Sequence, residues 1–193
     1  MSEWEYIRET LAARLDDASA PLIVALDGRC ACGKTTLAQR LGAHFHAPVF
    51  HMDDFYLPFS LRTPQRLALP GGHIDAERFA REVLEPASQG RELTYRPYRA
   101  HENAWGEERL IAPGRMYLAE GSYSLLPGLE MYYGYKIFLT HDKETQRARL
   151  LLREGEEKLQ AFVEHWIAEE EKYFSACDVR SRADAAFDTS DWW

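Results

Sequence analysis

The stretch Gly28-Arg29-Cys30-Ala31-Cys32-Gly33-Lys34-Thr35 decides the fold of this 193-residue chain. It matches the pattern G-x-x-x-x-G-K-[ST] in full. In such a loop the glycines permit turns that a side chain obstructs. The backbone N–H groups then point inward at a polyphosphate, and the helix that follows adds its partial positive charge. The stretch therefore predicts a phosphate-binding loop, and a glycine turn that binds no nucleotide is the weaker interpretation.

The residues on either side of the loop have the pattern that this motif requires. Residues 21–26 form a continuous apolar run, typical of a strand buried on both faces, and residues 34–45 have helical periodicity. We expect Lys34 to reach the terminal phosphates, Thr35 to bind Mg²⁺ and Thr36 to contact a phosphate. The other expected nucleotide contacts are Gly28, Arg29, Cys30, Ala31, Cys32 and Gly33.

Strands and helices alternate along the rest of the chain. Further strands are predicted at 48–52, 115–119, 135–140 and 183–189, and helices at 3–15, 76–87, 142–153 and 160–174. This alternation predicts an α/β fold with a doubly wound, mostly parallel five-stranded sheet and helices on both faces. Residues 93–98 and 108–111 predict a small β-hairpin insert, and residues 55–74 a long surface loop. We expect one domain over 1–193, with an acceptor-binding region at about 55–112 and a short helical lid at about 142–158.

The composition disfavours several classes of function. Lys and Arg number 23 against 31 Asp and Glu, so the net charge of −8 disfavours a protein that coats nucleic acid. No apolar run reaches the ~18 residues that span a bilayer, and no secretory signal pattern begins the chain. Cys30, Cys32 and Cys177 do not make a disulfide framework, so we expect a cytoplasmic protein. A homo-oligomer is left open.

Acidic residues follow two of the predicted strands. Asp53 and Asp54 come after the strand at 48–52, and Glu120 follows the strand at 115–119. Open parallel sheets bind ligands at the carboxyl ends of their strands. Asp53 and Glu120 are therefore candidates for binding Mg²⁺ and substrate, with Asp53 as the base for an attacking hydroxyl. An Asx-turn or a helix cap is the structural alternative.

Arginines on the helix predicted at 142–153 are candidates to neutralise a transferred phosphoryl group. Arg149 and Arg153 share one helix face and Arg147 is offset. We expect catalytic roles for Arg147 and Arg149 and a nucleotide contact for Arg153, on a lid that closes and excludes water. An ordinary solvated helix is the alternative, and the triplet at 169–171, three glutamates, is also predicted to be a solvated helix face.

Two cysteines lie inside the loop itself. Cys30 and Cys32 have no partner set at zinc-like spacing in the sequence. Their simplest interpretation is that they are small residues that fit a tight turn. Their position near a helix N-terminus also predicts a lowered thiol pKa and a loop that is sensitive to oxidation.

Together these features resemble the uridine kinase family of P-loop kinases, in the wider group that includes phosphoribulokinase, bacterial pantothenate kinase and nicotinamide riboside kinase. The resemblance covers most of the chain. It rests on the phosphate loop, on His51-Met-Asp-Asp-Phe-Tyr56, on Tyr95-Arg-Pro-Tyr98, on Glu120-Gly121 and on the arginines at 147–153. It implies a P-loop NTPase fold, Asp53 as catalytic base near the metal, and Tyr56 near the acceptor. It also implies a role for Glu120 near Mg²⁺ or substrate and phosphate contacts for the lid arginines.

The chain departs from that family in the hairpin and the lid. Uridine kinases usually follow the hairpin tyrosine with Asp-Phe, whereas Arg99 follows Tyr98 here, and the lid is shorter than usual. A positive Arg99, together with Arg62, Arg66 and His73, suits an anionic or polyhydroxy acceptor, and an ordinary surface position is the alternative for each. The expected acceptor contacts are Asp53, Tyr56, His73, Tyr98, Arg99 and Glu120.

The predicted function is that of an ATP-dependent kinase that uses Mg²⁺ and phosphorylates a hydroxyl of a small metabolite such as a nucleoside. Its expected partners are a nucleotide and a small-molecule acceptor, with no nucleic acid and no membrane. A nucleoside monophosphate kinase is an alternative, since Arg99 is suited to an acceptor phosphate. A P-loop switch or assembly ATPase is disfavoured, because Asn103 is the single asparagine and no Asn-Lys-x-Asp guanine motif can exist.

Overall fold

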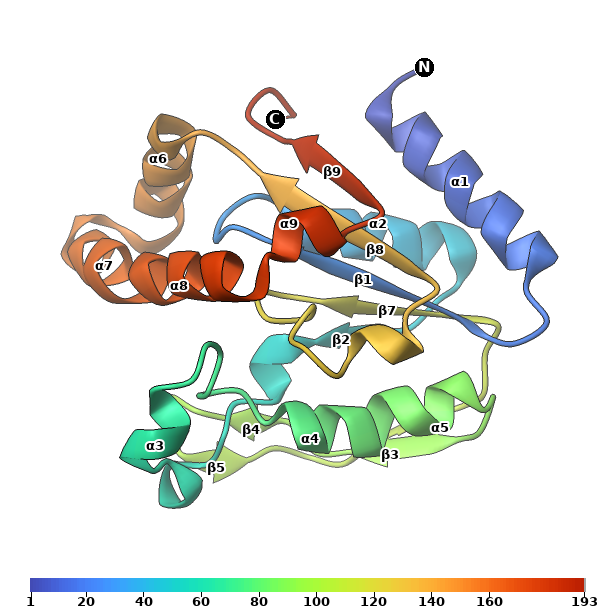
Figure 1. The fold of residues 1–193 in the computed structure, drawn as a ribbon, viewed down its shortest axis with the longest axis horizontal. Helices are drawn as coiled ribbons and strands as arrows, with labels where there is room; N and C mark the ends of the chain where they lie inside the picture. The colour runs from blue at the N-terminus through green and yellow to red at the C-terminus, as the bar shows by residue number, and fades with distance from the viewer. Residues whose placement is uncertain (193) are drawn as a thin grey trace.

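A central parallel sheet organises the molecule, whose residues 1–192 are described by the computed structural model (Figure 1). The strand order is β2-β7-β1-β8-β9, and every neighbouring pair is parallel. The doubly wound sheet predicted from the sequence is confirmed. The strands are β1 (Leu22–Gly28), β2 (Val49–His51), β7 (Met116–Glu120), β8 (Tyr135–Thr140) and β9 (Ala185–Asp188).

Helices cover both faces of this sheet, as predicted. They are α1 (Glu3–Asp17), α2 (Lys34–Phe45), α3 (Pro64–Leu67), α4 (Ala76–Phe79), α5 (Glu85–Ser88), α6 (Lys143–Glu154), α7 (Glu156–Ala161), α8 (Ala168–Cys177) and α9 (Val179–Arg182). Two π-helical segments, η3 (Ala80–Leu84) and η5 (Phe162–Ile167), join α4 to α5 and α7 to α8. The helix expected at 160–174 therefore begins earlier, at Glu156. None of the helices in residues 1–192 is long and apolar enough to cross a membrane.

Strand β1 is buried along its whole length, which explains its unbroken apolar sequence. Its alternate side chains serve two cores. Ile23 and Ala25 belong to the core beneath α4, η3 and α5, whereas Val24 and Leu26 belong to the core beneath α1 and α2. Two-sided packing holds the carboxyl end of β1 in place, and the phosphate loop begins there.

The insert between α5 and β7 is built from two short antiparallel ladders. β3 (Leu93–Tyr95) pairs with β6 (Arg109–Ile111), as predicted, and β4 (Tyr98–Arg99) pairs with β5 (Ala104–Trp105). The stretch 55–74 is irregular apart from η2 (Phe59–Leu61) and α3. Isolated bridges join Phe55 to Tyr98 and Tyr56 to Ile74, so this long stretch is tied to the insert.

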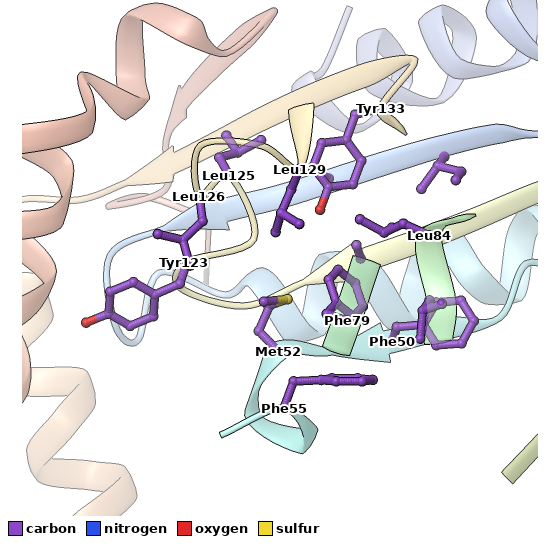
Figure 2. Close-up of a cluster of buried hydrophobic side chains, with 14 of the residues drawn as sticks. Phe50, Met52, Phe55, Phe79, Leu84, Tyr123, Leu125, Leu126, Leu129 and Tyr133 are labelled. Atoms are coloured by element: carbon purple, nitrogen blue, oxygen red, sulfur yellow. The ribbon is translucent and has the colours of Figure 1, made fainter. Parts of the chain in front are cut away.

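The larger core fixes the segment η1 (Met52–Asp54) and the residues that follow it (Figure 2). Phe55 is fully buried, with its ring 4.8 Å from that of Phe79 and 5.3 Å from that of Tyr95. The guanidinium of Arg78 lies over the same ring. Phe55 is therefore an anchor, and its burial sets the positions of Asp53 and Tyr56 on either side.

Candidate active site

The backbone of the phosphate loop explains its first glycine. Gly28 has φ of +145°, and a Cβ atom there would lie 2.0 Å from the carbonyl oxygen of Leu139 on the neighbouring strand. Any side chain at this position would therefore push β8 away from β1. Gly33, with φ of +87°, is the N-cap residue of α2, and no side chain caps the helix there. Since the first-turn N–H groups of a helix lack partners within the helix, they are available to an anion here.

Side chains from other parts of the chain hold the carbonyl groups of the loop. His141 Nε2 and Gln146 Nε2 lie 2.9 and 3.2 Å from the carbonyl oxygen of Cys30. Thr189 Oγ1 donates to the carbonyl of Cys32 at 3.0 Å. These donors come from the ends of β8 and β9 and from α6. They anchor the loop from outside, and the loop lines the cavity from the other side.

Lys34 is buried and turned toward the loop. Its Nζ donates to the carbonyl oxygens of Gly28 and Arg29, at 2.7 and 2.9 Å. Burial works against a charged ammonium, but the negative groups around it, Glu170 and Asp27 among them, outweigh this and raise the pKa of Lys34 above its ordinary range. The loop therefore contains a permanent positive charge.

The thiols of the loop are not activated. Burial raises the pKa of Cys32 to about 11 and also raises the pKa of Cys30. The lowered thiol pKa predicted from the helix N-terminus is wrong, because desolvation of the thiolate outweighs the nearby cations Lys34 and Arg153. Over residues 1–192 the acidic, histidine and cysteine side chains form no cluster of three or more suited to a metal ion.

Thr35 and Glu120 meet beside the loop. Thr35 Oγ1 donates to Glu120 Oε1 at 3.1 Å, and His51 Nδ1 contacts the same oxygen. Glu120 is 4% exposed, and its Oε2 has no hydrogen-bond partner. Mg²⁺ binds through one or two carboxylates together with water and substrate phosphates. A buried carboxylate oxygen without a partner, next to a hydroxyl, fits a magnesium ion that is completed by a polyphosphate.

Asp53 lies in the same cavity as the loop. The residue as a whole is exposed, and it lines that cavity. Partial desolvation by the surrounding protein, together with the nearby carboxylate of Glu120, raises the pKa of Asp53 above its ordinary value. A raised pKa makes a carboxylate a stronger base.

A cavity of about 890 Å³ joins the predicted nucleotide site to the predicted acceptor site. It brings together most of the residues singled out from the sequence. The lining residues that were also predicted from the sequence are Cys30, Ala31, Gly33, Lys34, Thr35, Thr36, Asp53, Tyr56, Glu120, Arg149 and Arg153. Three predicted loop residues are not among the lining residues: Gly28, Arg29 and Cys32.

Four further predicted site residues, outside the loop, are not among those that line the cavity. Arg99 is exposed and pairs with Glu102 at 3.2 Å, and the Tyr98 hydroxyl is bonded within the hairpin. His73 stacks on Tyr56, and burial lowers the pKa of His73 to about 4, so its ring is neutral. Arg147 is exposed on α6. Their substrate and catalytic roles stay predictions, which this placement does not support.

Arg149 lines the cavity, but its bonds tie α6 to the end of the chain. Its guanidinium donates to the carbonyl oxygens of Thr189 at 2.6 Å and Ser190 at 3.2 Å. Arg153 lies 3.3 Å from Cys30 Sγ and also lines the cavity. The two arginines thus place α6 against the loop.

Several residues of the cavity were not predicted from the sequence. Ser122 and Tyr123 follow Glu120, while Phe162 and Trp166 belong to η5, and Glu170 belongs to α8. The predicted solvated face at 169–171 is wrong for Glu170, which is 5% exposed. One signal was available, since Trp166, Glu170 and Tyr173 recur at spacings of four and three and so share a helix face.

A second cavity of about 220 Å³ lies at the start of α2. It is lined by Ser2, Glu3, Trp4, Thr36, Leu37, Arg40 and Trp192. Thr36 lines both cavities, so the two meet at the first turn of α2. Trp192 is held in place by its N–H bond to the carbonyl of Thr189 and by a bond from its indole to Glu3.

The strand order, the helices on both faces of the sheet and the loop after β1 together define the fold of the P-loop kinases. The chain is similar to a structure from Bacillus stearothermophilus described as a possible uridine kinase, with a TM-score of 0.68 and 19% identity over 93% of this chain and 100% of that one. No protein-family model and no curated protein matches this chain.

Two further structures share the fold. A candidate fructose transport system kinase from Silicibacter sp. TM1040 has a TM-score of 0.75 and 23% identity, over 97% of this chain and 100% of that one. YFH7 from Saccharomyces cerevisiae, described as a P-loop kinase candidate with a circular permutation, has a TM-score of 0.64 and 12% identity, over 97% and 99%. At these identities the likeness shows the fold alone.

Proposed function

We propose that this protein is a phosphotransferase that moves the γ-phosphate of ATP to a hydroxyl of a small metabolite. One observation supports this above all others: the phosphate loop with Lys34 and the carboxylates of Asp53 and Glu120 line a single cavity. Phosphoryl transfer depends on alignment and on charge neutralisation. A cavity with cations at one side and a carboxylate base at the other supplies both.

In this proposal each residue of the site has its own role. The loop N–H groups and Lys34 bind and orient the donor phosphates, and Thr35 with Glu120 would hold Mg²⁺, which neutralises phosphate charge when bound. Asp53 accepts the proton of the attacking hydroxyl. Arg153 is a lid cation that contacts the loop at Cys30. The lid segment and Phe162 of η5, which lines the same cavity, exclude water from the transfer.

The acceptor side of the cavity has an aromatic wall made of Tyr56, Tyr123 and Trp166. The ring of Trp166 lies 6.1 Å from that of Tyr56, edge to face. Such a wall suits an acceptor with a flat or carbon-rich face that also carries a hydroxyl, and a nucleoside is the leading candidate. Arg99 pairs with Glu102 outside the cavity lining, so no specific observation favours a monophosphate acceptor.

A screen of ATP consumption tests the proposal. Purified protein with Mg²⁺ is expected to consume ATP in step with phosphorylation of one compound class among nucleosides, sugars and vitamin alcohols. A set of nucleoside monophosphates serves as the matched comparison, because it differs from the nucleosides by the phosphate alone. Hydrolysis of ATP at the same rate with every acceptor and with none would contradict the proposal and favour a P-loop ATPase.

The second cavity is the expected place for the base of the nucleotide, because it begins at Thr36, where the phosphate site ends. Trp192→Ala is expected to weaken ATP binding about tenfold, the size of a lost base stack, and to leave binding of inorganic tripolyphosphate unchanged. Calorimetric titration of both ligands measures this. Trp105→Ala removes an indole from the hairpin insert and serves as control. An equal loss for ATP and tripolyphosphate would show that Trp192 does not contact the base.

A further inference from the structure

A carboxylate from α8 is bound to the phosphate loop. Glu170 Oε2 accepts the backbone N–H of Cys30 at 2.9 Å, and Glu170 Oε1 accepts the hydroxyl of Ser122. The side chain is 5% exposed and lines the main cavity. An anion with acceptor oxygens thus already uses one of the N–H groups of a loop whose sequence is typical of phosphate binding.

Neighbouring contacts strengthen this arrangement. Glu171 pairs with Arg29 at 2.8 Å, so two consecutive residues of α8 hold two consecutive residues of the loop. Lys34 is meanwhile bonded to loop carbonyl oxygens. The negative charge of Glu170 also acts on Lys34 and contributes to the raised pKa of that ammonium. In this state Glu170 and Glu171 of the protein itself neutralise the positive charge of the loop.

We propose that Glu170 is a selectivity residue of the donor site, which occupies the phosphate loop of the free protein and must be displaced by the polyphosphate of the nucleotide. This inference rests on the proposed function. A carboxylate and a phosphate are both negatively charged, and they repel each other when both lie within hydrogen-bond distance of the same loop. Both therefore cannot occupy the loop favourably. A small anion that makes few contacts does not displace Glu170, whereas a polyphosphate that engages the whole loop does.

The helix that carries Glu170 is preceded by a segment suited to act as a hinge when Glu170 leaves the loop. The π-helical segment η5 lies directly before α8, and such wide turns inside helices often occur at functional sites. Trp166 belongs to η5 and precedes Glu170 by four residues, so both side chains are on one helix face, and both line the cavity. Movement of Glu170 away from the loop therefore changes the surroundings of Trp166.

Calorimetric titration with pyrophosphate tests the proposal, because pyrophosphate needs neither an acceptor nor turnover. Glu170→Gln keeps the size of the side chain and removes its charge, and we expect it to bind pyrophosphate about tenfold more tightly than the unchanged protein. Glu169→Gln removes the same charge from the same helix, where Glu169 pairs with Lys172. This control is expected to bind as the unchanged protein does. Equal or weaker binding by Glu170→Gln, relative to Glu169→Gln, would overturn the proposal.

A second measurement covers the case in which Glu170→Gln does not fold. Pyrophosphate is expected to change the fluorescence of Trp166, isolated as the difference between the unchanged protein and Trp166→Phe. Binding of pyrophosphate without any change in that signal would overturn the displacement of Glu170. Absence of pyrophosphate binding in every variant would overturn the donor site and with it the proposed function. Tighter binding in Glu170→Gln without phosphoryl transfer to any acceptor would leave the displacement standing and overturn only the kinase.

Discussion

Lys34→Ala is expected to lower the turnover of phosphoryl transfer by about a thousandfold, the size of effect seen when one preorganised charge-stabilising donor is removed. Lys34 is the buried cation of the loop, and its Nζ lies 2.7 Å from the Gly28 carbonyl. With a donor bound, the same ammonium is available to the terminal phosphates. The alanine leaves this charge unreplaced in a site with few other cations facing the loop.

The measurement is the turnover number with the acceptor found in the screen, at saturating ATP. Lys143→Ala, which removes an exposed lysine from the first turn of α6, is the matched control and is expected to keep full activity. Thermal unfolding of both variants separates lost chemistry from a lost fold. Turnover in Lys34→Ala within a few-fold of the unchanged protein would contradict a donor-phosphate role for this residue.

Asp53→Asn is expected to lower turnover by about 10² to 10⁴, the contribution of a positioned general base, while ATP still binds. The amide has nearly the shape of the carboxylate but does not accept the proton of the hydroxyl. Removing the charge also leaves Glu120 with less repulsion, so the affinity for Mg·ATP is not expected to fall. Single-turnover kinetics together with calorimetry measure the two quantities separately.

The neighbouring acid provides the control for this prediction. Asp54 pairs with Arg109 at 2.7 Å and is not among the residues that line the main cavity. Asp54→Asn is therefore expected to keep most of the turnover and to change stability instead, because it weakens a contact between η1 and the hairpin insert. If Asp54→Asn loses turnover and Asp53→Asn keeps it, the base has been assigned to the wrong aspartate.

Much of the fold could be predicted from local sequence. The apolar run that became β1 and the helical pattern that became α2 are each contiguous, and burial on both faces dictates their composition. The acids at the carboxyl ends of β2 and β7 were correctly placed near the loop, because parallel strands end at one edge of the sheet. The role of Phe55 was not visible, since its burial depends on Phe79 and Tyr95 from separate elements.

The loop motif and the order of strands and helices are properties that neighbouring residues determine, and the sequence alone was sufficient for them. The contact between Glu170 and the loop joins residues that are 140 positions apart. The glutamate triplet has the pattern of a solvated face, and packing of α8 against the loop overrides that pattern. In the same way, Arg99 has the charge for an acceptor contact, but the hairpin pairs it with Glu102 outside the cavity lining. Only the tertiary structure decides which charges face the site, because helix docking and hairpin geometry place them there.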